Sequence, residues 1–112
     1  MQHILFANKS LLAGDTVTET LMQYAALLAN EDLADTVKIS AIGIDGESVV
    51  VTFLLDNGTN LVAETSRSEL EEPDNDDVVT YMRERIMRLS SPPLIGPDDQ
   101  TMPSNYEDLN LD

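Results

Sequence analysis

The chain has 112 residues, 42% of them hydrophobic, and its 21 acidic residues against six basic ones give a net charge of −15. Six bases are too few to build the basic face that a nucleic-acid binder needs, and an anionic membrane would repel such a chain. The sequence therefore predicts no nucleic-acid partner and no membrane partner. It contains no cysteine, no signal peptide at its start and no apolar run long enough to cross a bilayer, so we expect a cytoplasmic protein.

The N-terminal third of the sequence predicts a strand or hairpin followed by a helix. Residues 3–7 alternate as in a short strand, and residues 11–12 are candidates for a returning strand. Thr16 and Glu19 have the spacing of a capping box, which predicts that a helix begins there. Apolar residues recur at helical spacing up to an expected end near Asn30, namely Val17, Leu21, Tyr24 and Leu28.

Three segments rich in β-branched residues follow, at residues 36–44, 47–55 and 60–64. The dipeptides Asp45-Gly46 and Asn57-Gly58 separate them, and both favour the positive φ of tight hairpin turns. This pattern predicts a three-stranded antiparallel meander. Its middle strand is apolar on both faces, which indicates a central strand covered by helices on one face. A second copy of the chain is a candidate for covering the other face. A homodimer through the sheet is therefore one expectation.

A second helix is predicted to begin within residues 74–77, where acidic residues complement the helix dipole. Its apolar stripe comprises Val78, Val79, Met82, Ile86 and Leu89. The fold class is thus α+β: a three-stranded antiparallel meander plus an N-terminal strand or hairpin, with two helices on one face of the sheet. We expect this domain to cover residues 1–89.

Residues 90–112 form an acidic tail that contains four prolines and no basic residue. Near its end, apolar side chains alternate with acidic ones. Such segments are typical of those that fold onto an apolar groove with a basic rim, either on another protein or on the chain's own domain. The residues predicted to bind a partner are Tyr106, Glu107, Asp108, Leu109 and Leu111.

Other candidate sites in the sequence have weak support. The acidic segment 69–77 offers oxygen ligands for Ca²⁺ or Mg²⁺ but lacks the glycine and the closing glutamate of an EF-hand. His3 is the single histidine, and the sequence places no partner beside it. An anion site is one interpretation of the three arginines on the second helix, Arg83, Arg85 and Arg88, but ion pairs with Glu84 or with the acidic segment are the preferred interpretation. No nucleophile elbow, Walker loop or dinucleotide fingerprint occurs. We therefore predict no catalytic residue, no metal and no cofactor.

The resulting functional hypothesis is a small, non-catalytic, acidic protein that binds another protein as an adaptor or regulatory subunit. Two alternatives remain open. The first is an acidic inhibitor that imitates nucleic acid and binds a DNA-binding protein, because carboxylates on a surface complement a basic groove. The second is a small-molecule or metal-binding enzyme, for which the sequence supplies no motif.

Overall fold

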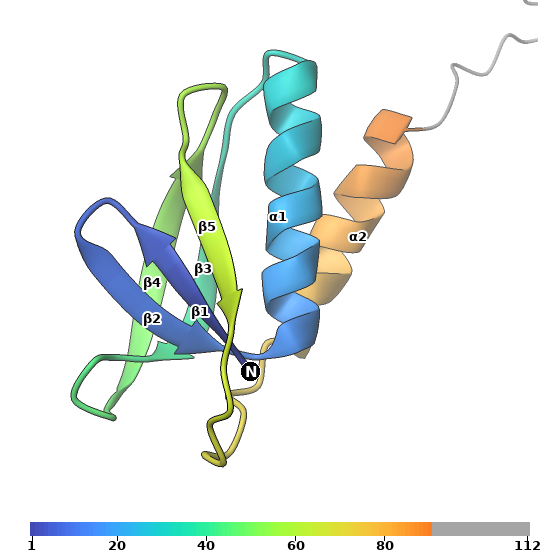
Figure 1. The fold of residues 1–112 in the computed structure, drawn as a ribbon. Helices are drawn as coiled ribbons and strands as arrows, with labels where there is room; N and C mark the ends of the chain where they lie inside the picture. The colour runs from blue at the N-terminus through green and yellow to red at the C-terminus, as the bar shows by residue number, and fades with distance from the viewer. Residues whose placement is uncertain (91–112) are drawn as a thin grey trace, which may run out of the picture.

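A computed structural model describes residues 1–90, which form one five-stranded antiparallel sheet and two helices. Both helices lie on the same side of the sheet (Figure 1), so the α+β class is confirmed. No helix within this part of the chain is long and apolar enough to span a membrane. The elements follow in the order β1 (Gln2–Phe6), β2 (Lys9–Ala13), α1 (Asp15–Asn30), β3 (Asp35–Ile42), β4 (Ser48–Leu55), β5 (Leu61–Thr65) and α2 (Asp76–Ser90).

The strands are arranged in the order β4-β3-β2-β1-β5, which corrects the predicted meander. The β3–β4 hairpin is confirmed, and Gly46 in its loop has the positive φ of 86° that this turn requires. The third strand, β5, pairs with β1 and not with β4. Gly58 does not have a positive φ, and the Thr59 hydroxyl donates a hydrogen bond to the Leu54 carbonyl (3.0 Å). This turn carries the chain away from β4 and across to β1.

Strand β4 lies at one edge of the sheet, so the prediction that it is central was wrong. Its inward-facing side chains pack in the core: Phe53 and Leu55 are buried, and Val49 and Val51 pack against the core. Its outward-facing apolar side chains are exposed. The apolar residues on the two faces of β4 therefore have different environments: those on one face pack in the core, and those on the other face are exposed to solvent.

The sheet is strongly curled, and α1 fills its concave face. Strands β2 and β3 share only the Leu12–Ile42 pair, so the sheet bends there. As a result the rings of Phe6 on β1 and Phe53 on β4 meet edge to face, with centroids 5.5 Å apart. Helix α1 contacts β1, β4 and β5, and α2 packs mainly on α1. The main buried side chains of this core include Ile4, Leu21, Tyr24, Leu28, Ile39, Phe53 and Met82.

The helix boundaries agree with the sequence except at one cap. Helix α1 begins at Asp15 with Gly14 in an extended conformation before it, and no side chain caps it, so the predicted Thr16–Glu19 capping box is not formed. Its end at Asn30 is confirmed. Helix α2 begins within the expected segment, where the Asp74 carboxylate accepts a hydrogen bond from the Asp76 N–H (3.0 Å). All five residues of its predicted stripe are buried or pack against the core.

The hydrogen-bond register divides the main-chain groups of β4 into two sets. Gly43 donates to the Glu47 carbonyl (2.8 Å), and this register continues through the hairpin with Ala41 opposite Val49 and Ile39 opposite Val51. In an antiparallel ladder, hydrogen-bonded pairs alternate with pairs whose N–H and C=O point outward. The outward-pointing groups of β4 therefore belong to Ser48, Val50, Thr52 and Leu54.

Two proline variants test this register. Val51→Pro removes an N–H that bonds to β3, and we expect it to lower the free energy of unfolding by about 3 kcal/mol or more. Val50→Pro removes an N–H that points away from β3, and its cost should stay below about 1 kcal/mol. Urea denaturation of both variants measures the difference, and equal costs would show that the register is wrong.

Candidate functional site at the open edge of β4

Strand β4 presents an edge with none of the usual protective features. Its eight residues contain no charged residue and no proline, and no other strand within residues 1–90 pairs with this edge. Val50 is 70% exposed and Leu54 is 55% exposed. Natural proteins usually shorten, charge or cover an edge strand, because its free N–H and C=O groups pair readily with another chain. A long, uncharged and apolar edge is therefore a candidate binding surface.

The other sheet edges within residues 1–90 are shorter or are occupied by a side chain. Beyond the bend, the main chain of β3 is free of β2, and Asn75 bonds to it instead. The Asn75 side chain accepts from the Ser40 N–H (2.7 Å) and donates to the Ser40 carbonyl (2.8 Å), as a neighbouring strand would. At the far edge, β5 has only five residues and runs beside α1, which contacts it (Figure 1). Among residues 1–90, β4 is therefore the longest strand whose outer edge has no neighbour.

A groove of about 580 Å³ runs beside the open edge. One wall is the β1–β2 hairpin and the other is β4 with the loop before it, and both project on the side of the sheet away from the helices (Figure 1). Ile44 in this loop is 94% exposed. The groove therefore combines apolar side chains with the outward-facing main chain of β4. The residues that contribute most to its chemistry are Lys9, Leu11, Ile44, Val49, Val50 and Thr52.

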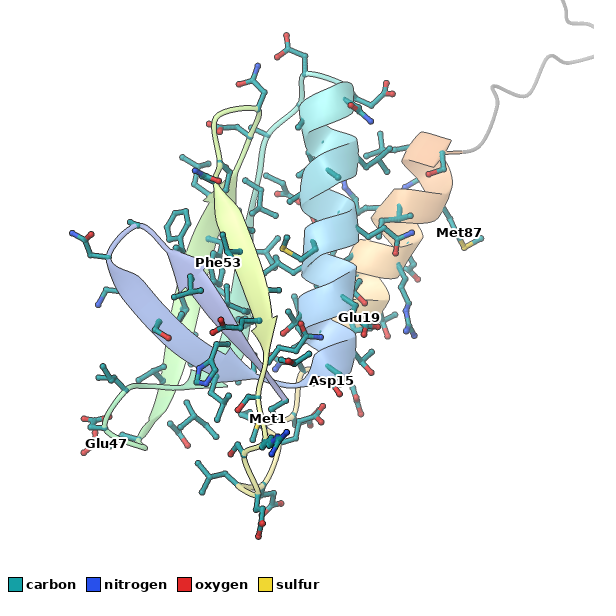
Figure 2. The ribbon with its side chains drawn as sticks, viewed as in Figure 1. Met1, Asp15, Glu19, Glu47, Phe53 and Met87 are labelled. Atoms are coloured by element: carbon teal, nitrogen blue, oxygen red, sulfur yellow. The ribbon has the colours of Figure 1, made fainter. Side chains whose placement is uncertain are left out.

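One of the six basic residues of the chain, Lys9, lines the groove. Lys38 on β3 lies opposite Thr52 on β4, but it lines a separate hollow together with Asp74, Asp76 and Asp77. Neither ammonium group forms an ion pair with an acid among residues 1–90. Acidic residues lie at the loop end of the strand, where Asp45 lines the groove and Glu47 is at the outer end of the loop (Figure 2). The strand between these charges is uncharged.

A partly exposed cluster of polar side chains lies where the two helices meet the start of β3. The Asp35 carboxylate accepts hydrogen bonds from the hydroxyls of Tyr24 on α1 (2.5 Å) and Tyr81 on α2 (2.6 Å). Arg85 on α2 donates from Nε to the Tyr24 hydroxyl oxygen (3.1 Å). The sequence indicated that Arg85 would pair with an acid or bind an anion, whereas in the structure its hydrogen-bond acceptor is the hydroxyl oxygen of Tyr24. This cluster ties α1, α2 and β3 together.

The protonation states of this cluster make it a structural feature and not an acid–base site. Burial, together with the hydrogen bond to Asp35, raises the pKa of Tyr24 to about 12, so its phenol stays protonated at neutral pH. Burial alone would raise the pKa of Asp35, but the hydrogen bonds from Tyr24 and Tyr81 outweigh it and lower that pKa. A carboxylate with a lowered pKa is a poor general base, and a phenol with a raised pKa is a poor general acid.

The other residues singled out in the sequence do not come together in one site. His3 lies on β1 opposite Glu64 of β5 and lines a small cavity with Leu70. Within residues 1–90 no three His, Cys, Asp or Glu side chains are close enough to hold a metal ion, so the acidic segment 69–77 does not form one. The predicted partner-binding residues of the tail, Tyr106, Glu107, Asp108, Leu109 and Leu111, lie outside the described residues.

The open edge of β4 is the feature that sequence analysis missed. The signal in the sequence was weak, because the eight uncharged residues of this strand are exceeded in length by other uncharged segments, such as residues 20–30. The strand was interpreted as central because both faces are apolar. Comparisons with known protein families, with curated proteins and with solved structures found no match for the chain.

Asn75→Ala tests whether Asn75 protects the edge of β3. The variant loses two hydrogen bonds to the main chain of Ser40, and we expect a loss of about 1–3 kcal/mol in the free energy of unfolding. Asn57→Ala is the matched control, because Asn57 makes one exposed side-chain hydrogen bond, to Asp32. Its cost should stay within about 0.5 kcal/mol. Chemical denaturation decides the point, and equal effects of the two substitutions would contradict this role.

Asp35→Asn tests the polar cluster through the pH dependence of stability. The pKa of Asp35 is lowered in the folded state, so its ionised form stabilises the fold above the unfolded-state pKa of about 3.9. At neutral pH the variant should be less stable than the native chain by about 1–3 kcal/mol. This difference should shrink as the pH falls through the folded-state pKa. Thermal unfolding between neutral and acidic pH measures it, with Glu84→Gln on the exposed face of α2 as control. A difference that does not vary with pH would refute this account.

Proposed function

We propose that this protein is a non-catalytic protein-binding domain that receives an extended segment of its partner at the open edge of β4. The observation that carries the proposal is the uncharged edge strand itself, with outward-facing N–H and C=O groups beside a groove of about 580 Å³. An extended segment placed there would pair with the main chain of β4 in the way that one strand pairs with the next.

We expect the main-chain groups of the edge to provide affinity and its side chains to provide specificity. The main-chain groups of Val50 and Thr52 would bind any extended segment, because they make the same hydrogen bonds whatever its sequence. The exposed side chains of Val50, Leu54 and Ile44 would select apolar residues on the segment, since they gain from losing contact with water. Lys9 and Asp45, which both line the groove, would add one contact to an acidic residue and one to a basic residue of the segment.

The alternative functions receive less support from the described residues. The Tyr24–Asp35–Tyr81–Arg85 cluster has protonation states unsuited to acid–base chemistry, which favours a non-catalytic role. Mimicry of nucleic acid rests on the net charge alone, and the open edge is the part of the surface that carries no charge. A homodimer through the sheet would use the same β4 edge, and a mass in solution that doubles as the protein concentration rises would identify it.

A proline block tests the proposed site with selected peptides. Random twelve-residue peptides displayed on phage are selected against the native full-length chain, and the dissociation constant of each recovered peptide is measured by calorimetry. Val50→Pro removes an outward-facing N–H and places a ring on the edge, while the bonds to β3 remain. We expect it to weaken peptide binding at least about tenfold, a loss of about 1.4 kcal/mol.

Thr65→Pro is the matched control for this experiment. Thr65 is an exposed residue of β5, the other edge strand, and its N–H faces away from β1 because the Ser66 N–H donates to the Met1 carbonyl (3.1 Å). This variant should bind the selected peptides with unchanged affinity. Peptides that bind the Val50→Pro variant as tightly as the native chain would show that the protein binds elsewhere.

A further inference from the structure

We infer that the partner's extended segment is apolar where it pairs with β4 and basic where it passes the loop end of that strand. The loop end comprises residues 43–47, which join β3 to β4, and the first residues of β4. The inference rests on the proposed function and deepens it, because it names the chemistry of the segment that the same edge receives.

Three exposed carboxylates lie near the loop end. Asp45 lines the groove, and Glu47 directly precedes β4 at the outer end of the loop (Figure 2). Asp74, which precedes α2 in the chain, lines a further hollow together with Ser48 and Val50. None of these three carboxylates forms an ion pair with a base among residues 1–90, so all three are available to a positive charge of the partner.

The basic residues near the loop end do not balance these acids. Among the residues that line the groove, Lys9 is the one base. Lys38 lines a hollow that it shares with Asp74, Asp76 and Asp77, so three acids surround one base there. The loop end is therefore negatively charged, within a chain whose net charge is −15. Such a surface attracts a basic segment at long range and stabilises it after contact.

The rest of the edge has a different chemistry. The eight residues of β4 carry no charge, and Val50 and Leu54 expose apolar side chains. Beyond the strand, the Asp56 carboxylate accepts hydrogen bonds from the Gly58 N–H (2.8 Å) and from the Thr59 hydroxyl (3.2 Å), so it is engaged in the turn that follows. The edge is therefore apolar along its length and most acidic at the loop end.

The direction of the segment follows from the ladder. Every strand pair of this sheet is antiparallel, and antiparallel pairing is slightly more stable per residue than parallel pairing. Residues of an antiparallel segment that lie opposite Leu54 and Val50 are four positions apart and share one face. The segment passes Ser48 six positions after Leu54, so its basic residues lie on the C-terminal side of its apolar ones.

The same charges disfavour a second copy of this chain as the occupant. In a two-fold antiparallel pairing of β4 with itself, the loop end of each strand lies beside the far end of the other. With Val50 opposite Leu54, Ser48 is opposite Asp56 of the second copy, and Glu47 lies next to that carboxylate. Like charges at such positions destabilise strand pairing, and two chains of net charge −15 repel each other.

Three acetylated and amidated ten-residue peptides test the inference by calorimetry on the native full-length chain. The first has valine at its first and fifth positions, lysine at its last four and threonine elsewhere. The second has the same residues in reverse order, and the third has glutamate in place of lysine. At an ionic strength of about 20 mM we expect the first to bind about tenfold more tightly than either of the others. Raising the salt concentration to about 500 mM should remove most of this difference, because salt screens exposed charges.

Asp45→Asn/Glu47→Gln tests whether the loop end is the source of the preference. The asparagine side chain keeps the oxygen that accepts a hydrogen bond from the Glu47 N–H (3.2 Å), so the loop conformation is retained. This variant should bind the first peptide about tenfold more weakly than the native chain. Glu19→Gln/Glu84→Gln is the matched control, because it makes the same change in net charge on the helices, on the other side of the sheet (Figure 1). Its affinity for that peptide should change by less than about twofold.

The remaining outcomes overturn the inference in distinguishable ways. Equal affinities of the first and third peptides for the native chain, both lost in the Val50→Pro variant, would refute the charge preference and leave the proposed function in place. Equal affinities of the first and second peptides would refute the direction. Tight binding of the first peptide to the Val50→Pro variant would show that the acidic surface attracts it away from β4. Absence of binding by the first peptide, with a mass in solution that doubles, would show that a second copy occupies the edge.

Discussion

The antiparallel pairing of β3 with β4 decides which main-chain groups the protein uses internally and which it presents to solvent. Because hydrogen-bonded and outward-facing pairs alternate, half of the main chain of β4 is engaged with β3 and half points away from the domain. The same alternation on β3 turns Ser40 away from β4, where Asn75 binds it. One ladder thus has an outward-facing side on each strand, and only the side on β3 is covered within residues 1–90.

The curled sheet depends on this arrangement. Strands β2 and β3 separate after the Leu12–Ile42 pair, so the concave face is deep enough to hold α1 and to bring Phe6 against Phe53. The separation leaves part of β3 without a strand neighbour, and residues from the α2 side of the molecule compensate for it. Asn75 bonds to Ser40, and Tyr81 on α2 bonds to Asp35 at the start of the same strand. Helix α2 is therefore attached to the sheet by polar contacts at two places, while its apolar stripe packs mainly on α1.

The sequence predicted the elements well and their pairing only in part. The helix stripes and the β3–β4 hairpin follow from local periodicity and from the Asp45-Gly46 turn, which are properties of neighbouring residues. The pairing of β5 with β1 joins Leu61 to Phe6, more than fifty residues apart, and no local pattern reports such a contact. The site was missed for a related reason. A strand with apolar residues on both faces shows the same sequence pattern whether both faces are buried or one is exposed. Only the strand order distinguishes these two cases.

Neighbouring residues of β4 are constrained by different properties: alternate positions determine either the stability of the fold or the chemistry of the exposed surface. Its odd-numbered positions face the core and bond to β3, so changes there alter the stability of the fold. Its even-numbered positions, such as Val50 and Thr52, face outward with both their side chains and their main-chain groups. Substitutions that keep the strand conformation at these positions leave the core intact. The recognition properties of such a surface are therefore free to diversify among descendants of this chain while the architecture beneath it persists.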